Sequence, residues 1–172
     1  MAAIDGFFKK LINLVLDFSF MDKLRILTVC TANICRSPVA QLVLKEFLRS
    51  KEVVVTSAGI MAVNFLPAHK FINEIMHQEG YKDIALHQSH VIIPQMISLS
   101  DIILCMENTH LKWITEKNPS AIGKTRLLSH WSSKEDVPDP IGEPFEVFIE
   151  NVKLIKQYCN EWSSKIVEIG FV

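Results

Sequence analysis

The sequence predicts an α/β fold, a three-layer sandwich in which a parallel sheet is covered by helices on both faces. Short apolar runs rich in β-branched residues alternate with longer stretches whose apolar residues recur at helical spacing. This alternation is typical of consecutive βαβ units. The chain has 172 residues, 49% of them hydrophobic and 22% charged, so we expect one domain with a substantial core.

Four short apolar runs are expected to form the strands of the sheet. They are Leu24–Cys30, Val53–Ser57, Asp101–Met106 and Thr125–Leu128. Apolar residues at helical spacing predict a helix that contains residues 39–48 and further helices over Ala68–Gln78, Pro94–Leu99, a stretch through Trp113, and Glu143–Ile169. The inner face of the last helix is predicted to carry Phe145, Phe148, Ile149, Val152, Ile155 and Cys159.

Residues 1–20 are a separate N-terminal extension that precedes a domain of residues 21–172. The extension is apolar, but Lys9, Lys10, Asn13 and Asp17 interrupt it, so it holds no run of membrane-spanning length, and it lacks the order of a secretory signal. Its remaining apolar residues recur at helical spacing and predict an amphipathic helix. This helix is expected to pack on the domain or to mediate self-association. Docking on a membrane surface and a true start at Met21 are the alternatives.

Charge and cysteine usage exclude several classes of protein. The net charge of −1 and a pI near 6.6 argue against nucleic acid as a partner. The four cysteines are too few and too scattered for a disulfide scaffold, which indicates a cytoplasmic protein. His87 and His90 have neither a cysteine pair nor a carboxylate motif beside them, so they are interpreted as surface or packing residues, and no metal or other cofactor is expected.

The segment Cys30–Pro38, which reads CTANICRSP, carries the clearest chemical signal. It connects a predicted strand to a predicted helix, with Ser37 expected to cap that helix and Pro38 to take its first position. Loops in this place present several backbone N–H groups, and the helix dipole adds positive potential, so a tetrahedral dianion fits there. The forked guanidinium of Arg36 can bind two oxygens of such a dianion. The remaining substrate-binding candidates of this loop are Thr31, Ala32, Asn33, Ile34, Cys35 and Ser37.

Cys30 is the candidate nucleophile, because it ends the strand and points into this positive nest. The local field favours the thiolate, which can attack phosphorus in line and form a phosphocysteine. Ser37 can hydrogen-bond the sulfur, and Asn33 is expected to bond nearby backbone and hold the loop open. A Cys-x5-Arg pattern alone is weak, and a buried inert thiol would be the better interpretation of Cys30 by itself. The longer string between a strand and a helix is far more specific.

The departure of a leaving group needs an acid, and Asp139 is the candidate. It lies between Pro138 and Pro140, which restrict the loop at residues 132–144. A Pro-Asp-Pro sequence taken alone is more often a simple turn. Glu135 and Asp136 are nearby competitors, and we interpret them as solvated loop charges.

Residues 30–38 together with Asp139-Pro140 resemble the low-molecular-weight protein-tyrosine phosphatase family, and the resemblance covers about residues 24 to 169. It implies a four-stranded parallel sheet flanked by helices, and hydrolysis of phosphotyrosine through a phosphocysteine without a metal. It implies catalytic roles for Cys30, Arg36 and Asp139. It also implies that Cys35 can form a reversible disulfide with the nucleophile, which would protect it from irreversible oxidation.

The sequence departs from the family pattern around the loop and the pocket walls. Ala32 replaces the usual glycine, which would cost strain if that backbone required a positive φ. Ile141 replaces an aromatic residue, and the loop after Gly59 supplies Val63 and its neighbours as apolar wall. Aliphatic walls resemble the bacterial branch, whose members often act on autophosphorylating tyrosine kinases. Such a kinase, or another phosphotyrosine-bearing protein, is the implied partner.

Two alternative functions remain open at this point. An arsenate reductase can use a thiolate in the same oxyanion nest, but it normally needs resolving thiols on a mobile segment. No cysteine pair occurs between residues 60 and 100. The other alternative is a catalytically weak phosphate-binding relative, for which Ala32 and Ile141 are the only support.

Overall fold

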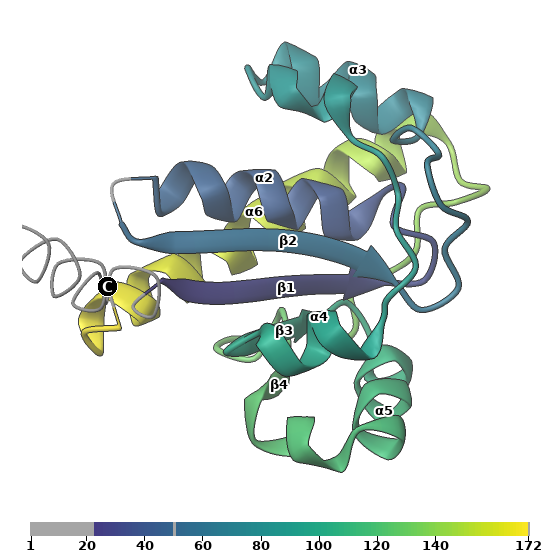
Figure 1. Ribbon diagram of the computed structural model, residues 1–172. Coiled ribbons are helices and arrows are strands. Elements are labelled where there is room, and N and C mark those ends of the chain that lie inside the picture. Colours follow the sequence, from purple (N-terminus) through teal and green to yellow (C-terminus); the bar gives the residue numbers. More distant parts are fainter. Residues whose placement is uncertain (1–22, 50, 172) are drawn as a thin grey trace, which may run out of the picture.

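The computed structural model describes residues 23–49 and 51–171, and the predicted extension of residues 1–20 lies outside this part of the chain. Four parallel strands form one sheet in the order β2-β1-β3-β4 (Figure 1). The strands are β1 Leu24–Cys30, β2 Val53–Gly59, β3 Ile102–Cys105 and β4 Thr125–Leu127. All the predicted strands are therefore confirmed, and no end differs from the predicted one by more than two residues.

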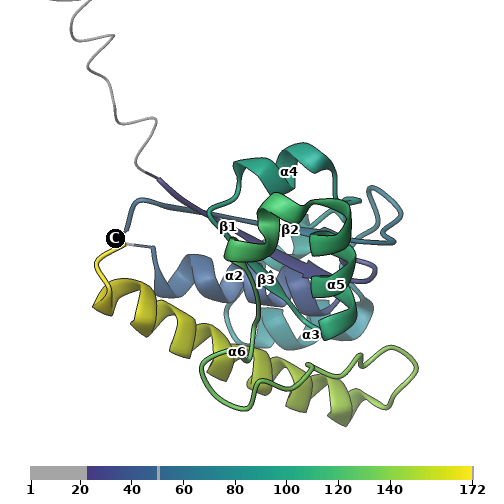
Figure 2. The ribbon, with the colours of Figure 1, turned by 90° about the horizontal axis from the view of Figure 1, so that it is seen from below.

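Helices cover both faces of this sheet, as predicted. The helices are α2 Arg36–Phe47, α3 Lys70–Gln78, α4 Pro94–Leu99, α5 Asn108–Lys117 and α6 Phe145–Glu168, with 3-10 turns η2 Lys82–Leu86 and η3 Pro119–Lys124. Helices α2, α3 and α6 lie on one side of the sheet, and α4 and α5 lie on the other (Figures 1 and 2). None of the described helices is long and apolar enough to cross a membrane.

The central strand β1 supplies side chains to two separate cores, because successive residues of a strand point to opposite faces. Ile26 packs in the core shared with α2 and α6, whereas Leu27 and Val29 pack in the core shared with α4 and α5. A strand buried on both faces reads as a continuous apolar run, which is the pattern that predicted it. The predicted inner face of α6 is also confirmed, with Phe148, Val152, Ile155 and Cys159 buried.

The strand register brings the carboxyl ends of β1, β2 and β3 to one edge of the sheet. Cys30 pairs with Gly59 of β2, and its neighbour Val29 pairs with Cys105 of β3. In an open parallel sheet, ligands bind outside these carboxyl ends, between strands whose connections leave in opposite directions. The candidate loop at residues 31–35 begins at this edge.

Candidate active site

Helix α2 begins earlier than predicted, and this changes the role of Ser37. Its first residue is Arg36, its N-cap is Cys35, and no side chain caps it. The prediction that Ser37 caps this helix and that Pro38 takes the first position is therefore wrong. Pro38 lies within the first turn, where backbone N–H groups have no partner in the helix, so its missing N–H costs no helical hydrogen bond.

The sulfur of Cys30 lies at the base of the loop in polar surroundings. Ser37 Oγ is 3.0 Å from Cys30 Sγ, and the backbone N–H of Asn33 donates to the same sulfur at 3.3 Å. Cys30 is only 2% exposed, yet it lines a small pocket of about 10 Å³. The other residues that line this pocket are Ala32, Ile34, Cys35, Arg36, Asp139 and Ile141. Cys30 therefore lines a pocket together with residues of the loop, the arginine and the acid candidate.

Asn33 holds the loop in its curved shape from the inside. Its φ of 56° is in the left-handed region, which asparagine tolerates better than most residues, whereas Ala32 has no positive φ. Ala32 therefore carries none of the backbone strain that a positive φ at this position would have caused. Asn33 Nδ2 donates to Ser37 Oγ and to Ser57 Oγ, both at 2.9 Å, and its Oδ1 accepts from the backbone N–H of His90 at 2.8 Å.

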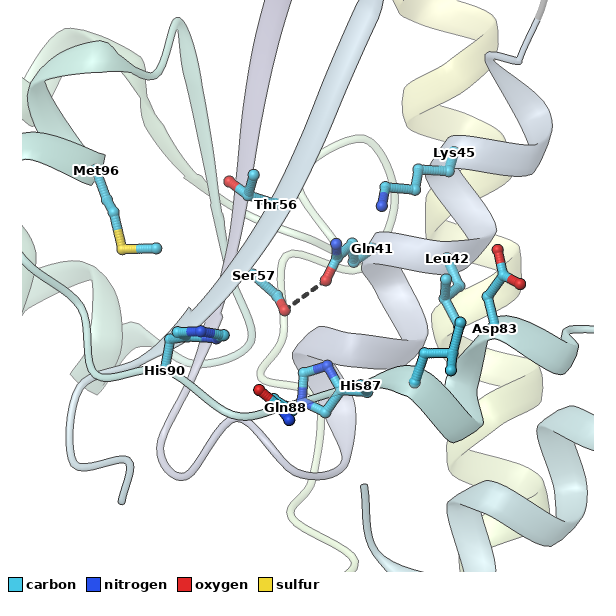
Figure 3. A pocket seen from close by; sticks show the side chains of 11 residues that line it. Gln41, Leu42, Lys45, Thr56, Ser57, Asp83, His87, Gln88, His90 and Met96 are labelled. Carbon is cyan, nitrogen blue, oxygen red and sulfur yellow. Dashed lines mark hydrogen bonds between the residues drawn. The ribbon is translucent and has the colours of Figure 1, made fainter. Parts of the chain in front are cut away.

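Ser57, His87 and His90, which all make hydrogen bonds with Asn33, also line a second and larger cavity of about 480 Å³ (Figure 3). His87 Nε2 lies 2.7 Å from the carbonyl oxygen of Asn33. Burial lowers the pKa of His87, although the hydrogen bond to Asn33 acts in the opposite direction. Ser57 Oγ donates to Gln41 Oε1 at 2.6 Å, which ties the network to α2. His87 is thus a packing residue, as predicted, but one that supports the candidate loop.

Arg36 is 1% exposed and reaches across the site to groups from three other segments. Nη1 donates to Glu107 Oε1 and to the carbonyl oxygen of Val137, the latter at 2.9 Å. Nη2 donates to Asp139 Oδ2 at 2.6 Å and lies 3.5 Å from Thr31 Oγ1. The guanidinium is therefore held between carboxylates, with Nη2 on the side of the pocket that Asp139 lines.

Glu107 is a site residue that the sequence analysis missed. Burial alone would raise the pKa of Glu107, but the hydrogen bond and the charge of Arg36 outweigh it and lower that pKa. Glu107 is therefore ionised and neutralises a buried cation. The signal was present in the sequence, since Glu107 follows the predicted strand at residues 101–106, and polar residues just after a parallel strand gather at the site edge.

Asp139 comes to the pocket from the loop before α6 and keeps its side chain 41% exposed. The amide of Asn151 donates to the carbonyl oxygen of Pro138 at 2.8 Å, and the N–H of Val137 donates to Met106 at 2.7 Å. These contacts anchor the two residues that come directly before the acid. The competitor Asp136 instead accepts from the backbone and side chain of Asn108, at 2.8 Å each, at the start of α5.

The predicted apolar walls divide into two groups. Ile141 is 48% exposed and lines the pocket, whereas Val63 is 65% exposed and is not among the residues that line it. The loop that carries Val63 is nevertheless joined to the candidate loop, because the N–H groups of Ile60 and Met61 donate to the carbonyls of Cys30 and Thr31 at 3.0 and 2.9 Å. Among the residues that line the pocket, the aliphatic side chains are therefore those of Ala32, Ile34 and Ile141.

Gly59 explains how closely this neighbouring loop can approach. A Cβ at Gly59 would lie 2.5 Å from the Thr31 carbonyl oxygen and 2.9 Å from the Asn33 nitrogen. We expect Gly59→Ala to displace residues 31–33, lowering the free energy of unfolding by about 1–3 kcal/mol and weakening anion binding. Gly123→Ala is the control, because a Cβ there meets nothing within 4 Å. Denaturant unfolding and phosphate titration measure both effects, and equal behaviour of the two variants would contradict the prediction.

The chain matches known proteins over the whole of this fold. The sequence profile of the family described as low molecular weight phosphotyrosine protein phosphatase matches residues 25–169. A putative low molecular weight protein-tyrosine-phosphatase of Klebsiella pneumoniae is 36% identical over 141 residues, which cover 82% of this chain and 96% of that protein. The protein Etp of Escherichia coli K12, also a low molecular weight protein-tyrosine-phosphatase, is 30% identical over 82% of this chain and 93% of its own length.

Solved structures show the same similarity in three dimensions. Vibrio vulnificus Wzb, solved with benzylphosphonate, aligns with a TM-score of 0.77 and 36% identity over 83% of this chain and 99% of that chain. The YwlE arginine phosphatase of Geobacillus stearothermophilus aligns with a TM-score of 0.78 and 30% identity over 84% and 94%. With the profile, the relatives and the fold in agreement, this chain belongs to the low molecular weight phosphotyrosine protein phosphatase family.

Proposed function

We propose that this protein hydrolyses phosphotyrosine through a phosphocysteine intermediate, with Cys30 as nucleophile, Arg36 as phosphate ligand and Asp139 as general acid. The observation that carries the proposal is the shared pocket in which these three side chains meet. They come from the end of β1, the start of α2 and the loop before α6. A nucleophile, a cation and an acid from three separate segments fit a displacement at phosphorus better than a structural contact does.

In the first step, the Cys30 thiolate attacks phosphorus and the S–P bond forms as the P–O bond to the phenol breaks. The loop N–H groups and Arg36 Nη2 bind the equatorial oxygens of the phosphate. To do so, Nη2 gives up its hydrogen bond to Asp139 and donates to a phosphate oxygen instead. Asp139, released from Arg36, brings a proton to this step as the general acid. That proton passes to the leaving phenolate oxygen, so a neutral phenol departs.

In the second step, water attacks the phosphocysteine and inorganic phosphate leaves. Asp139, now a carboxylate, takes a proton from the water as its oxygen bonds to phosphorus and the S–P bond breaks. The electron pair of that bond returns to Cys30 as a thiolate. Ser37 Oγ, 3.0 Å from the sulfur, stabilises this leaving thiolate by hydrogen bonding.

The walls of the pocket favour an aromatic ring over a charged side chain as leaving group. Ala32, Ile34 and Ile141 are apolar, and a phenyl ring buries apolar surface against them, whereas the guanidinium of phosphoarginine would lose hydration there. The partner we propose is therefore a protein that carries phosphotyrosine, with an autophosphorylating bacterial tyrosine kinase as the first to test. The unpaired state of all four cysteines fits a cytoplasmic location.

The cysteines outside the pocket argue against arsenate reduction. Cys105 and Cys159 are fully buried, and burial raises the pKa of both thiols far above the ordinary value. Buried neutral thiols cannot resolve a covalent adduct on Cys30. Cys35 lines the pocket, but burial and the nearby charges of Cys30 and Asp139 raise its pKa as well.

A substrate panel tests the proposed function. The wild-type protein is assayed with p-nitrophenyl phosphate, a phosphotyrosine peptide, a phosphoarginine peptide, and arsenate with a dithiol. We expect turnover of both aryl phosphates, with kcat/KM for the phosphotyrosine peptide at least about tenfold above that for phosphoarginine, a difference of about 1.4 kcal/mol. Preferred turnover of phosphoarginine or arsenate would reassign the substrate, and no turnover of any would refute the proposal.

Removal of the acid has an effect that depends on the leaving group. We expect Asp139→Asn to lower kcat/KM, which reports the step that releases the phenol, by about 10²-fold or more for phenyl phosphate, because an unprotonated phenolate leaves poorly. The loss for p-nitrophenyl phosphate should be much smaller, since that phenolate is a better leaving group. Glu143→Gln, an exposed carboxylate of the same loop, is the charge-matched control and should keep wild-type kinetics. An equal loss on both substrates would exclude Asp139 as the acid.

A further inference from the structure

The imidazole of His110 connects two elements of the site that the proposed mechanism does not otherwise join. His110 is 1% exposed and lies in the first turn of α5. Its Nδ1 accepts the backbone N–H of Glu107 at 3.1 Å, which forms part of a capping box. Its Nε2 lies 3.0 Å from the hydroxyl oxygen of Thr31 in the candidate loop. One ring thus spans the end of β3 and the end of β1.

The first of these contacts fixes the proton on the ring. Because Nδ1 accepts from Glu107, the proton of a neutral His110 is on Nε2, which then donates to Thr31 Oγ1. Burial lowers the pKa of His110, although the charge of Glu107 opposes this, so the neutral ring predominates at neutral pH. Thr31 therefore accepts from the histidine and retains its own O–H proton for another acceptor.

Both residues that the ring contacts are neighbours of Arg36. The carboxylate of Glu107 accepts from Nη1, and Thr31 Oγ1 lies 3.5 Å from Nη2. Nη2 also holds the half-exposed Asp139, the contact that phosphate must displace. When Asp139 turns away, Glu107, the Val137 carbonyl and Thr31 are the contacts that remain to the guanidinium in the described structure. Two of these three are set in place by His110.

We propose that His110 and Thr31 are a positioning pair, which holds the Arg36 guanidinium in its phosphate-binding orientation. Neither residue needs to touch the reacting atoms: His110 fixes the backbone of Glu107 and the hydroxyl of Thr31, and these two groups flank the arginine. This inference rests on the proposed function, in which Arg36 binds the phosphate. It assigns a purpose to a buried histidine and to a threonine side chain that the mechanism leaves unused.

Matched variants separate the hydrogen bonds from the volume of the side chains. Thr31→Val removes only the hydroxyl, while Thr31→Ser keeps it. His110→Leu removes both ring contacts, while His110→Gln keeps an acceptor and an N–H donor at a similar separation. We expect Thr31→Val and His110→Leu each to lower kcat/KM for p-nitrophenyl phosphate about tenfold, mainly through kcat, and the serine and glutamine substitutions to restore most of it. The double variant Thr31→Val/His110→Leu should lose little more than either single variant.

The pH dependence supplies a readout that a merely structural role would not move. A protonated ring carries a hydrogen on Nδ1, which opposes the Glu107 N–H. The groups that face the ring are Glu107, Arg36, Asp139 and Asp136. The ratio of wild-type to His110→Gln kcat/KM cancels the titrations of substrate and nucleophile. It should fall as the pH is lowered below the ordinary imidazole value of 6.5, because only the wild-type side chain titrates there.

Orthovanadate binding, measured by calorimetry, keeps this test independent of turnover. Each variant is first shown to be folded by its unfolding midpoint, and the Kd for orthovanadate is then compared with that of the wild type. A Kd raised about tenfold in Thr31→Val but not in Thr31→Ser supports the pair, even if the substrate panel reveals no turnover. Unchanged vanadate binding and kinetics in folded Thr31→Val, or additive losses in the double variant, would overturn it.

Discussion

Cys30→Ser should lower kcat for every aryl phosphate by a factor of about 10³ or more, which corresponds to about 4 kcal/mol in the activation free energy. A serine hydroxyl in the same place is hardly ionised at neutral pH, so the variant has no thiolate to attack phosphorus. Binding of orthovanadate should persist, because Arg36 and the loop amides remain. Steady-state kinetics and calorimetry measure the two quantities on the same preparation.

Cys159→Ala is the control for this substitution. Cys159 is a fully buried thiol of α6 that contacts the carbonyl oxygen of Ala40, away from the pocket. It should retain wild-type turnover with only a loss of stability. Substantial turnover in folded Cys30→Ser would remove Cys30 from its proposed role, and a similar loss of kcat in folded Cys159→Ala would show that the effect is not specific.

Arg36→Lys is expected to have the second largest effect, a loss of about 10²–10³ in kcat. A lysine ammonium is a compact point charge and lacks the planar fork by which Nη1 bonds Glu107 and the Val137 carbonyl while Nη2 is left for the phosphate. Vanadate binding should weaken together with kcat, in contrast to Cys30→Ser. Stability should also fall, because Glu107 loses the hydrogen bond and the guanidinium charge that compensate its burial.

Arg49→Lys is the matched control, because Arg49 is a largely exposed arginine that pairs only with Glu46 among the described residues. It should leave kinetics, vanadate binding and stability unchanged. Wild-type vanadate binding in folded Arg36→Lys would mean that the guanidinium does not bind the phosphate. The proposal that His110 positions Arg36 for phosphate binding would then fail as well.

Local sequence patterns were sufficient to predict most of the fold. The spacing of apolar residues along the chain indicates which side chains are buried. It therefore predicted strands such as Val53–Ser57 and the long helix that ends before Ile169. The positions at which helices begin were predicted less accurately. Helix α3 begins at Lys70 instead of Ala68, because the side chain of His69 accepts the N–H of Phe71 at 3.3 Å and caps it. Histidine is not among the usual capping residues, so this cap could not be predicted from the residue type.

The candidate site was predictable where it is continuous in the sequence and unpredictable where it depends on tertiary contacts. Residues 30–38 form one motif, and proline neighbours singled out Asp139. Ser37 was expected to cap a helix and to bond the sulfur, and only the second contact is present. The contacts of Arg36 with Glu107, 71 residues away, and of Thr31 with His110, 79 residues away, follow from the register of β1 with β3. Sequence periodicity alone does not give that register.

The most direct measurement of the proposed chemistry is the capture of the covalent intermediate. Wild-type protein is mixed with radiolabelled aryl phosphate, quenched within one turnover and digested, and the labelled peptide is identified. We predict phosphate on the sulfur of Cys30, formed as phenol is released and lost again at the rate of phosphate release. Rapid phenol release with no label on Cys30, or with label on another residue, would contradict the account.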